Sequence, residues 1–204
     1  MFSSNNIFAK EQVDKLGNAI RFLTEAGPLS KTKLLKLIYL LEEISVKKHG
    51  IPFFNFRFDT WKFGPVIPDI FIEFSTSPSI LKGYIDRVSE HDNCNIKGIG
   101  EFSDDEFSQN DLNILSYVNE FYKDKDTTEL INLTHRENSP WYIAATRNNV
   151  YELLNSELIN KTDFPVDILS LVNHDPIKKS IYMDYLEHFG SPVKNDCECL
   201  IKEP

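Results

Sequence analysis

The sequence predicts a mainly α-helical fold: a single compact domain of about seven helices with a small antiparallel β element. Three observations support this class. Apolar residues recur at helical spacing through most of the chain, Ser and Asp caps and Gly-Pro breaks mark the helix ends, and strand-like alternation is confined to short stretches. The chain has 204 residues, 41% of them hydrophobic, which is enough to build one core.

The first predicted helix covers residues 10–25 and is broken by Gly27 and Pro28. Ser30 is expected to cap a second, central helix. That helix should end at Gly50, which can adopt the left-handed conformation, and Pro52 prevents its continuation.

The central helix has a wide apolar arc and a polar arc. At about 100° per residue the apolar positions cover roughly half of the helix surface, enough for core contacts on more than one side: Leu34, Leu35, Leu37, Ile38, Leu41 and Ile44. The polar arc holds Lys36, Tyr39, Glu43 and Lys47, each three or four residues from the next. This arc is interpreted in two ways, as a solvated face with a Glu43–Lys47 pair or as a partner-binding surface.

Short strands are expected after the central helix. Residues 54–61 alternate between aromatic and polar types and predict one strand, followed by a rigid turn around Gly64 and Pro65. Pro68 suits the first position of a new helix. Residues 84–88 and 95–99 could form two further strands, pairing with residues 56–61.

The second half of the chain is predicted to be helical throughout, with helices at 111–123, 128–135, from Trp141 onward, at 150–159, at 166–172 and from Asp175-Pro176 to Phe189. The expected caps are Ser108, Thr127 and Ser139, and Pro140 suits a first helical position. In the last helix Ile177, Ile181, Tyr185 and Phe189 are expected to face inward. We expect one shared core of Leu34, Ile38, Leu41, Ile44, Leu115, Val118, Phe121 and Trp141.

Composition excludes several classes of protein. The formal charge of −9 argues against direct nucleic-acid binding, which needs clustered Lys and Arg, but it suits a basic protein partner. No run of apolar residues reaches the length of a membrane span, and the first nine residues lack the features of a signal peptide. The odd count of three cysteines then indicates a reducing, cytoplasmic location with free thiols.

The search for catalytic or metal-binding motifs gives mostly negative results. No nucleophile motif, phosphate loop or metal-ligand set is complete, so we expect no catalytic residue, no metal and no cofactor. Cys197 and Cys199 could bind a metal, but a closed zinc site needs four ligands, and only Cys94 or a histidine could complete it.

The most enzyme-like cluster is His135, Arg136 and Glu137, at a predicted helix C-terminus. A histidine there gains from the helix dipole and could orient against a carboxylate, as in an enzyme or a small-ligand sensor. The alternative is that His135 caps the helix and its neighbours form a structural ion pair or an interface. Trp61 and Trp141 are likewise either partner anchors or core residues.

Several segments together resemble one known family. The motif segments are Gly27-Pro28-Leu29, residues 33–39, residues 61–68 (Trp-Lys-Phe-Gly-Pro-Val-Ile-Pro) and residues 130–137 followed by Pro140-Trp141. In this order and spacing they resemble the Panacea-domain proteins, the phage- and plasmid-associated group that includes SocA-like and GepA-like antitoxins. The resemblance covers residues 10–145, and the helix at 175–189 resembles the family's closing helix. It implies a domain at 10–190 with an insertion at 147–174, followed by a tail at 191–204.

The resemblance also implies a function and a set of candidate residues. Such a protein is bacterial or phage-encoded and neutralises a toxin encoded beside it by direct binding, and SocA-like members also deliver the toxin to an ATP-dependent protease. The candidate partner-binding residues are Lys36, Tyr39, Glu43, Trp61, His135, Arg136 and Glu137. The residues expected to shape the motif are Gly64, Pro65, Pro68, Pro140 and Trp141. We also expect the Gly64-Pro65 turn to pack against the segment from Leu130 to Trp141.

Overall fold

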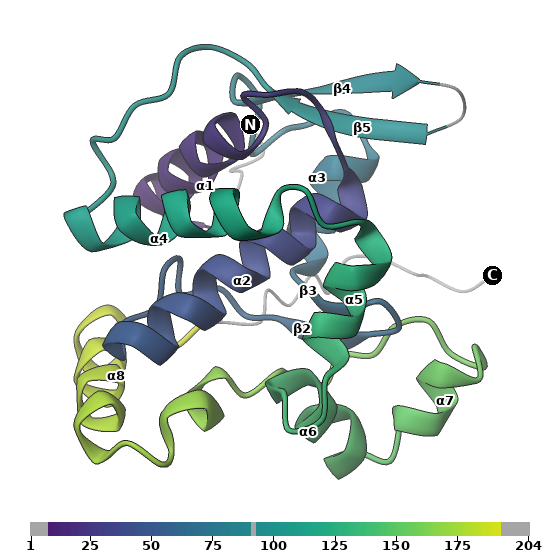
Figure 1. The fold of residues 1–204 in the computed structure, drawn as a ribbon, viewed down its shortest axis with the longest axis vertical. Coiled ribbons are helices and arrows are strands. Elements are labelled where there is room, and N and C mark those ends of the chain that lie inside the picture. Colours follow the sequence, from purple (N-terminus) through teal and green to yellow (C-terminus); the bar gives the residue numbers. More distant parts are fainter. Residues whose placement is uncertain (1–7, 91–92, 193–204) are drawn as a thin grey trace, which may run out of the picture.

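The structure is a computed structural model and describes residues 8–90 and 93–192. Within these residues it contains eight α-helices, one 3₁₀ helix and five strands (Figure 1). The elements are α1 (Lys10–Leu23), β1 (Leu29–Ser30), α2 (Lys31–His49), β2 (Asp59–Trp61), β3 (Gly64–Val66), α3 (Pro68–Ser75), β4 (Ile85–Glu90), β5 (Asn93–Gly98), α4 (Gln109–Tyr122), α5 (Thr127–His135), α6 (Pro140–Arg147), α7 (Tyr151–Asn155), η1 (Ile168–Val172) and α8 (Pro176–Phe189). The predicted class, a single mainly α domain with a small antiparallel element, is confirmed. In the described ranges, no helix is long and apolar enough to cross a membrane.

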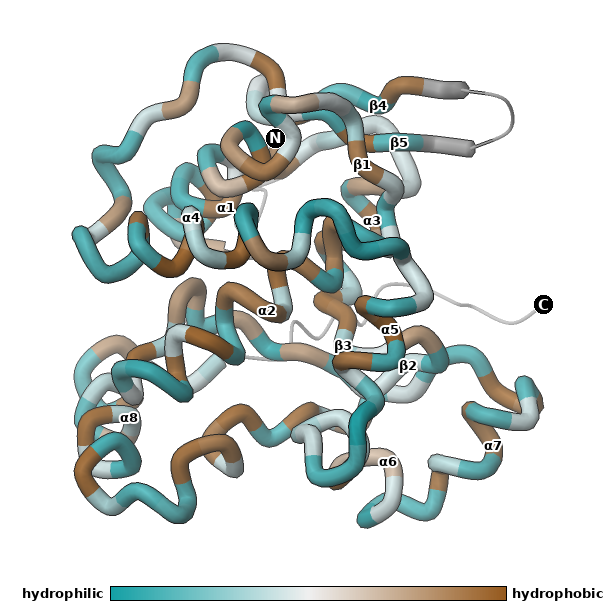
Figure 2. Tube along the Cα trace, viewed as in Figure 1, coloured by the Kyte–Doolittle hydropathy of each residue, from teal (hydrophilic) through white to brown (hydrophobic). Residues whose placement is uncertain are grey.

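The central helix α2 lies in the middle of the molecule, with other elements on all sides (Figures 1 and 2). The Ser30 side chain accepts a hydrogen bond from the Lys33 backbone N–H, and Gly50 closes the helix in the left-handed conformation. Both ends are as predicted. Twelve of the 19 residues in this helix are buried, so nearly its whole circumference contributes to the interior.

The strands form two small antiparallel sheets. The predicted hairpin is present as β4 and β5, but its third strand is β1, with Leu29 opposite Ile96. The expected pairing with residues 56–61 is therefore wrong. Only Asp59–Trp61 of that stretch is a strand, and it pairs with β3. The connecting turn is Lys62-Phe63, so the predicted turn at Gly64-Pro65 is displaced and these two residues begin β3. The aromatic residues that precede β2 are instead buried as side chains in the core: Phe53, Phe54, Phe56 and Phe58.

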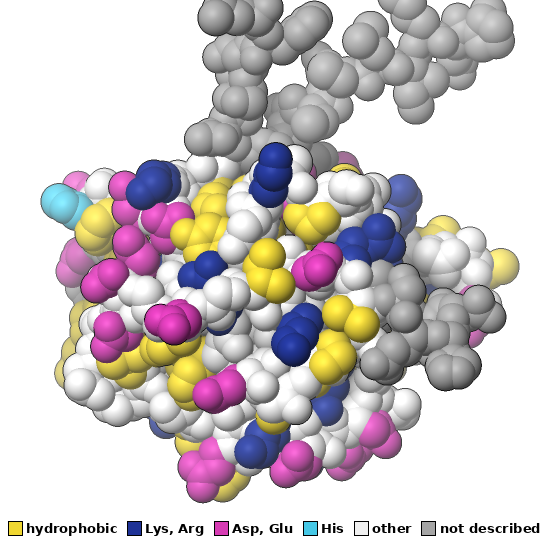
Figure 3. All heavy atoms as spheres, turned by 90° about the horizontal axis from the view of Figure 1, so that it is seen from above, with side chains coloured by type: hydrophobic (Ala, Val, Ile, Leu, Met, Phe, Trp, Pro, Cys, Tyr) yellow, Lys and Arg dark blue, Asp and Glu magenta, His cyan; other side chains and the backbone are white. Residues whose placement is uncertain are grey.

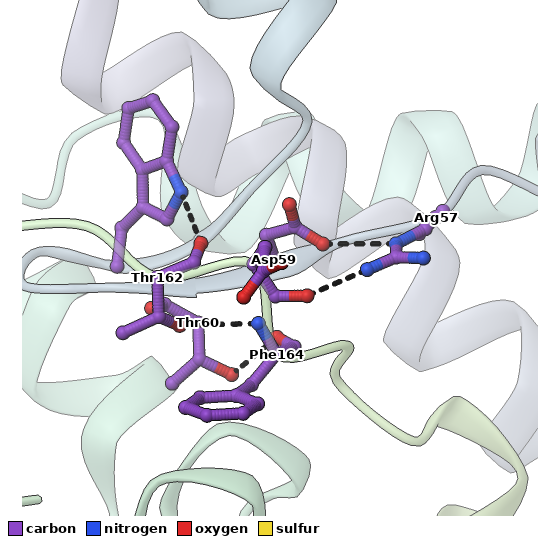
Figure 4. Close-up of polar contacts among 7 residues, drawn as sticks. Arg57, Asp59, Thr60, Thr162 and Phe164 are labelled. Atoms are coloured by element: carbon purple, nitrogen blue, oxygen red, sulfur yellow. Dashed lines mark hydrogen bonds and ion pairs between the residues drawn. The ribbon is translucent and has the colours of Figure 1, made fainter. Parts of the chain in front are cut away.

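Residues 160–166 run beside β2 like an additional strand. The Thr60 N–H donates to the Phe164 carbonyl at 2.9 Å, and the Thr162 hydroxyl donates to the Thr60 carbonyl at 2.7 Å (Figure 4). Next to the start of β2, Arg57 forms an ion pair with Asp59 at 2.9 Å and donates a hydrogen bond to the Asp163 carbonyl at 2.6 Å. The segment expected to be an insertion is thus packed into the domain through backbone hydrogen bonds.

Most of the predicted shared core is confirmed, with two corrections. Ile44 is only partly buried, and Phe121 is 56% exposed, packing at the surface against Tyr117. Helix α4 turns Leu115 and Val118 inward, and the residue that continues this stripe is Tyr122 rather than Phe121.

The predicted inward face of α8 is also wrong. Ile177 is 74% exposed and Phe189 is 66% exposed, whereas Tyr182 is buried at 4% exposure. The helix docks through its other side, where the Lys178 ammonium donates to the Lys47 carbonyl at the end of α2. The cysteine pair Cys197 and Cys199 lies outside the described residues.

Candidate functional site

Three of the four residues of the polar arc of α2 face the interior of the protein, and only the fourth, Lys47, is exposed. Lys36 is 1% exposed, Tyr39 is 0% and Glu43 is 3%. The expectation of a solvated face is therefore wrong, although the Glu43–Lys47 pair is present, at 2.5 Å. In this conformation Tyr39 and Lys36 lie beneath the surface, so their side chains are enclosed by the fold.

Lys36 is held by strand β3. Its ammonium donates to the Pro65 carbonyl at 2.9 Å. A Cβ at Gly64 would lie 2.6 Å from the Thr134 hydroxyl and 3.0 Å from the Lys36 ammonium, and Gly64 has a φ of +100°. Glycine is required here both by the backbone conformation and by the close approach of α2 and α5. Burial lowers the pKa of Lys36 to about 7.

Glu43 connects α2 to the end of α5. Arg136, the C-terminal cap of α5, forms an ion pair with one Glu43 oxygen and also donates to the Leu133 carbonyl. Tyr39 lies in the same region, where burial, and then the Glu43 charge, raise the pKa of its phenol. Neither the Tyr39 hydroxyl nor the second Glu43 oxygen has a hydrogen-bond partner among the described residues.

His135 completes the buried cluster. Its ring stacks on Trp141 with centroids 3.7 Å apart, and its Nε2 is buried with no partner among the described residues. Burial, and then the nearby Lys36, lower the pKa of His135 to about 4. The ring is therefore neutral at physiological pH, and its environment is that of a packed side chain.

The two motifs predicted separately from the sequence are thus neighbours in space. Gly64 and Pro65, which lie in β3, pack against α5 as expected, and the Trp141 indole donates to the Trp61 carbonyl at 2.9 Å. Pro68 and Pro140 each begin a helix, α3 and α6. Of the predicted partner-binding residues, Lys36, Tyr39, Glu43, His135 and Arg136 form one cluster. Trp61 lies on its edge, and Glu137 is exposed outside it.

The sequence analysis did not single out Phe63. This side chain is 51% exposed at the tip of the β2–β3 turn. It lines a small surface hollow of about 40 Å³ together with residues of α2, β2, β3, α3 and the 147–174 segment: Thr32, Leu35, Lys36, Trp61, Val66, Phe71 and Asn160. The signal that could have identified it is a phenylalanine directly before Gly64-Pro65, because the tip of a turn is normally polar.

The chemistry of the cluster is that of a structural network. Among the residues that the structure describes, no three potential ligands come together to hold a metal ion. Three of its groups, Lys36, Tyr39 and His135, have strongly shifted pKa values. Lys36 joins α2 to β3, and His135 joins α5 to α6.

One comparison with known proteins identifies the family. No curated protein and no solved structure matches the chain. A family model described as the SocA-like antitoxin, Panacea domain, matches residues 34–142 of the 204, which is just over half of the chain and includes the whole buried cluster. The chain belongs to the SocA-like antitoxin family with a Panacea domain.

Proposed function

We propose that this protein is the antitoxin of a toxin–antitoxin pair and neutralises its toxin by direct binding. The observation that carries the proposal is the family match over residues 34–142. The matched region contains the buried cluster, the β2–β3 turn and the first turn of α6 at residues 140–142. In this proposal the protein acts by binding, without catalysis.

The buried cluster supports the binding surface rather than forming it. Lys36, Tyr39 and Glu43 are each at most 3% exposed, so they position neighbouring groups that reach the surface. Those groups are Trp61 and Phe63 at the β2–β3 turn, with Arg136 and Glu137 at the end of α5. Aromatic and arginine side chains are frequent anchors of protein interfaces.

The charge of the protein supports a basic toxin as the partner. The net charge of −9 would raise the association rate with a basic protein through long-range attraction. This acidity is not gathered on the face seen in Figure 3, where acidic and basic side chains are interspersed with small apolar patches.

Family membership also supports two further proposals. The protein would act in the cytoplasm of a bacterium, as a chromosomal or phage-encoded antitoxin with its toxin encoded by a neighbouring gene. It would also deliver the bound toxin to an ATP-dependent protease. Neutralisation and delivery are separable, because a tight complex protects cells even when the protease is absent.

Co-expression with the adjacent reading frame tests the proposal. Expression of the toxin alone should stop growth, and expression of this protein should restore it and recover the toxin in a stoichiometric pull-down complex. Failure of both rescue and binding would refute the antitoxin function. The half-life of the toxin, measured with and without this protein in cells with and without each ATP-dependent protease, tests delivery independently.

A further inference from the structure

A groove of about 470 Å³ lies between the C-terminal end of α1 and the segment that follows β5. We call it the α1–β5 groove. Its walls carry two aromatic rings and four charged side chains: Phe22 and Phe102, with Arg21, Glu25, Lys97 and Glu101. Five of its nine lining residues are exposed, so the groove is open to solvent. It lies on one side of α2 and the β2–β3 turn on the other (Figure 1).

The groove is held in shape by the close approach of α1 and β5. A Cβ at Gly98 would lie 2.5 Å from the Arg21 Cα, so glycine is what lets the strand approach the helix. The Gly98 N–H donates to the Thr24 hydroxyl at 2.8 Å, and the Arg21 Nε donates to the Ile99 carbonyl at 2.6 Å. A partner would therefore meet a site that is already formed, which lowers the entropic cost of binding.

The free charges around the groove are mainly acidic. Among the described residues, no salt bridge involves Glu25 or Glu101. Of the two cations in the lining, Arg21 directs three hydrogen bonds to groups of its own chain, and Lys97 is exposed. The loop that follows the groove adds three carboxylates: Asp104, Asp105 and Glu106. An occupant of complementary charge is therefore basic.

We propose that the toxin inserts a basic side chain, arginine or lysine, into the α1–β5 groove. Its charge would lie beside the carboxylates of Glu25 and Glu101. Its methylene groups would pack on the rings of Phe22 and Phe102, whose centroids are 5.4 Å apart. The inference rests on the proposed antitoxin function and adds a contact apart from the β2–β3 turn.

The openness of the groove favours a side chain of a macromolecule over a small free ligand. A bound small molecule normally has about 70–90% of its surface enclosed, which walls as exposed as these do not provide. A protein partner encloses its own inserted side chain, because the surrounding surface of the partner covers the groove.

A double variant tests the contact in the full-length protein, with the toxin of the adjacent reading frame as the binding partner. Glu25→Gln with Glu101→Gln removes both carboxylates at exposed positions, so the melting temperature should change little. Toxin affinity, measured by titration calorimetry, should fall by about tenfold or more. The matched control is Glu120→Gln with Glu187→Gln, which gives the same net charge from exposed positions on α4 and α8. It should leave affinity within about twofold of wild type, since only the overall field changes.

Lys97→Gln tests the polarity of the occupant, because it removes a cation from the same groove. Toxin affinity should rise by about twofold to fivefold, since a basic side chain is no longer repelled. The control is Lys179→Gln at an exposed position on α8, which should change affinity by less than about 1.5-fold. If the carboxylate variant binds more tightly and Lys97→Gln more weakly, the occupant is acidic and the proposal is overturned.

The remaining outcomes separate this inference from the proposed function. A wild-type protein that does not bind the toxin overturns both. A wild type that binds, with the carboxylate variant binding as tightly as its matched control, overturns only the groove contact. The inserted side chain can be identified by changing each lysine and arginine of the toxin to glutamine. One position should be non-additive with Glu101→Gln or Glu25→Gln. If every position is additive with both, no basic side chain of the toxin contacts these carboxylates and the proposal fails.

Discussion

The imidazole of His135 lies flat against the indole of Trp141, with ring centroids 3.7 Å apart and planes inclined by 11°. His135 is the last residue of α5, and Trp141 is the second residue of α6. Because the indole N–H also donates to the Trp61 carbonyl, the stack fixes α5, α6 and β2 relative to one another. The residue that looked most like a catalytic histidine in the sequence is thus packed into the contact between α5 and α6.

The burial of His135 makes stability sensitive to acid. Its pKa is about 4 in the folded protein and 6.5 in the unfolded chain, so the unfolded chain binds more protons between these values. The free energy of unfolding should therefore fall as pH drops from 6.5 to 4, by up to about 3 kcal/mol from this residue. His135→Phe keeps a stacking ring and should remove this loss, measured by urea unfolding at pH 7 and 4.5. The same substitution at exposed His174 is the control, and an unchanged slope in His135→Phe would contradict the prediction.

The hydroxyl of Tyr39 should contribute little to stability. The ring is fully buried and packs against Phe58 with centroids 5.3 Å apart, while the hydroxyl has no hydrogen-bond partner among the described residues. Tyr39→Phe should thus leave the free energy of unfolding unchanged within about 0.5 kcal/mol or raise it, whereas Tyr39→Ala should cost about 3–5 kcal/mol. Chemical denaturation measures both. A loss above about 1.5 kcal/mol in Tyr39→Phe would instead indicate that the hydroxyl donates to the Glu43 carboxylate.

The Gly64 position should be far less tolerant than a second glycine of similar conformation. Gly64 has a φ of +100° and Gly83 a φ of +91°, but a Cβ at Gly83 meets nothing within 4 Å. Gly83→Ala should cost about 1–2 kcal/mol from the backbone alone. Gly64→Ala should cost clearly more, since its methyl group meets the Thr134 hydroxyl and the Lys36 ammonium. If thermal unfolding showed equal losses of stability in the two variants, the side chains of Thr134 and Lys36 would be able to move away from the methyl group without destabilising the fold.

Local signals were sufficient to predict most helix ends. The Ser30 and Ser108 caps, the Ser139-Pro140 start and the Gly50 stop are each set by residues within a few positions, and all are present in the structure. The cap of α5 is Asp126 rather than Thr127, one residue earlier than predicted. Either side chain can accept the capping hydrogen bond, so the sequence did not distinguish them.

Features that depend on distant residues could not be predicted in the same way. Lys36 and Glu43 on α2 are buried against partners that lie far away in the sequence. Pro65 follows Lys36 by 29 positions, and Arg136 follows Glu43 by 93 positions. On α8 the stripe containing Ile177 is as apolar as the side containing Tyr182, and only the docking of the helix beside the end of α2 decides which is buried. Periodicity identifies an apolar face but not the element that covers it.

Glu42 gives a pH dependence of the opposite sign to that of His135. Its side chain is 1% exposed, and its Oε2 accepts the Phe54 backbone N–H at 2.8 Å. Burial raises its pKa from 4.5 to about 7, against the effect of backbone N–H groups and Lys15. Between these values the folded protein binds more protons than the unfolded chain, so the free energy of unfolding should fall as pH rises from 4.5 to 7. In the wild type this change partly cancels the opposite change in the free energy of unfolding that His135 causes. Single variants are therefore needed to measure the contribution of each residue.

Glu42→Gln should therefore stabilise the protein at pH 7.5 by about 1–3 kcal/mol, because the amide keeps an oxygen for the Phe54 N–H and carries no charge. At pH 5 the gain should be smaller, since Glu42 is then largely protonated in the folded protein. Urea unfolding at the two pH values measures the difference, with Glu120→Gln at an exposed position as the control. A loss of stability that is equal at both pH values would mean that the hydrogen bonds to the carboxylate outweigh the cost of burying its charge. The loop at Phe54, which Glu42 holds against α2, would then be the part of the fold that depends on this charge.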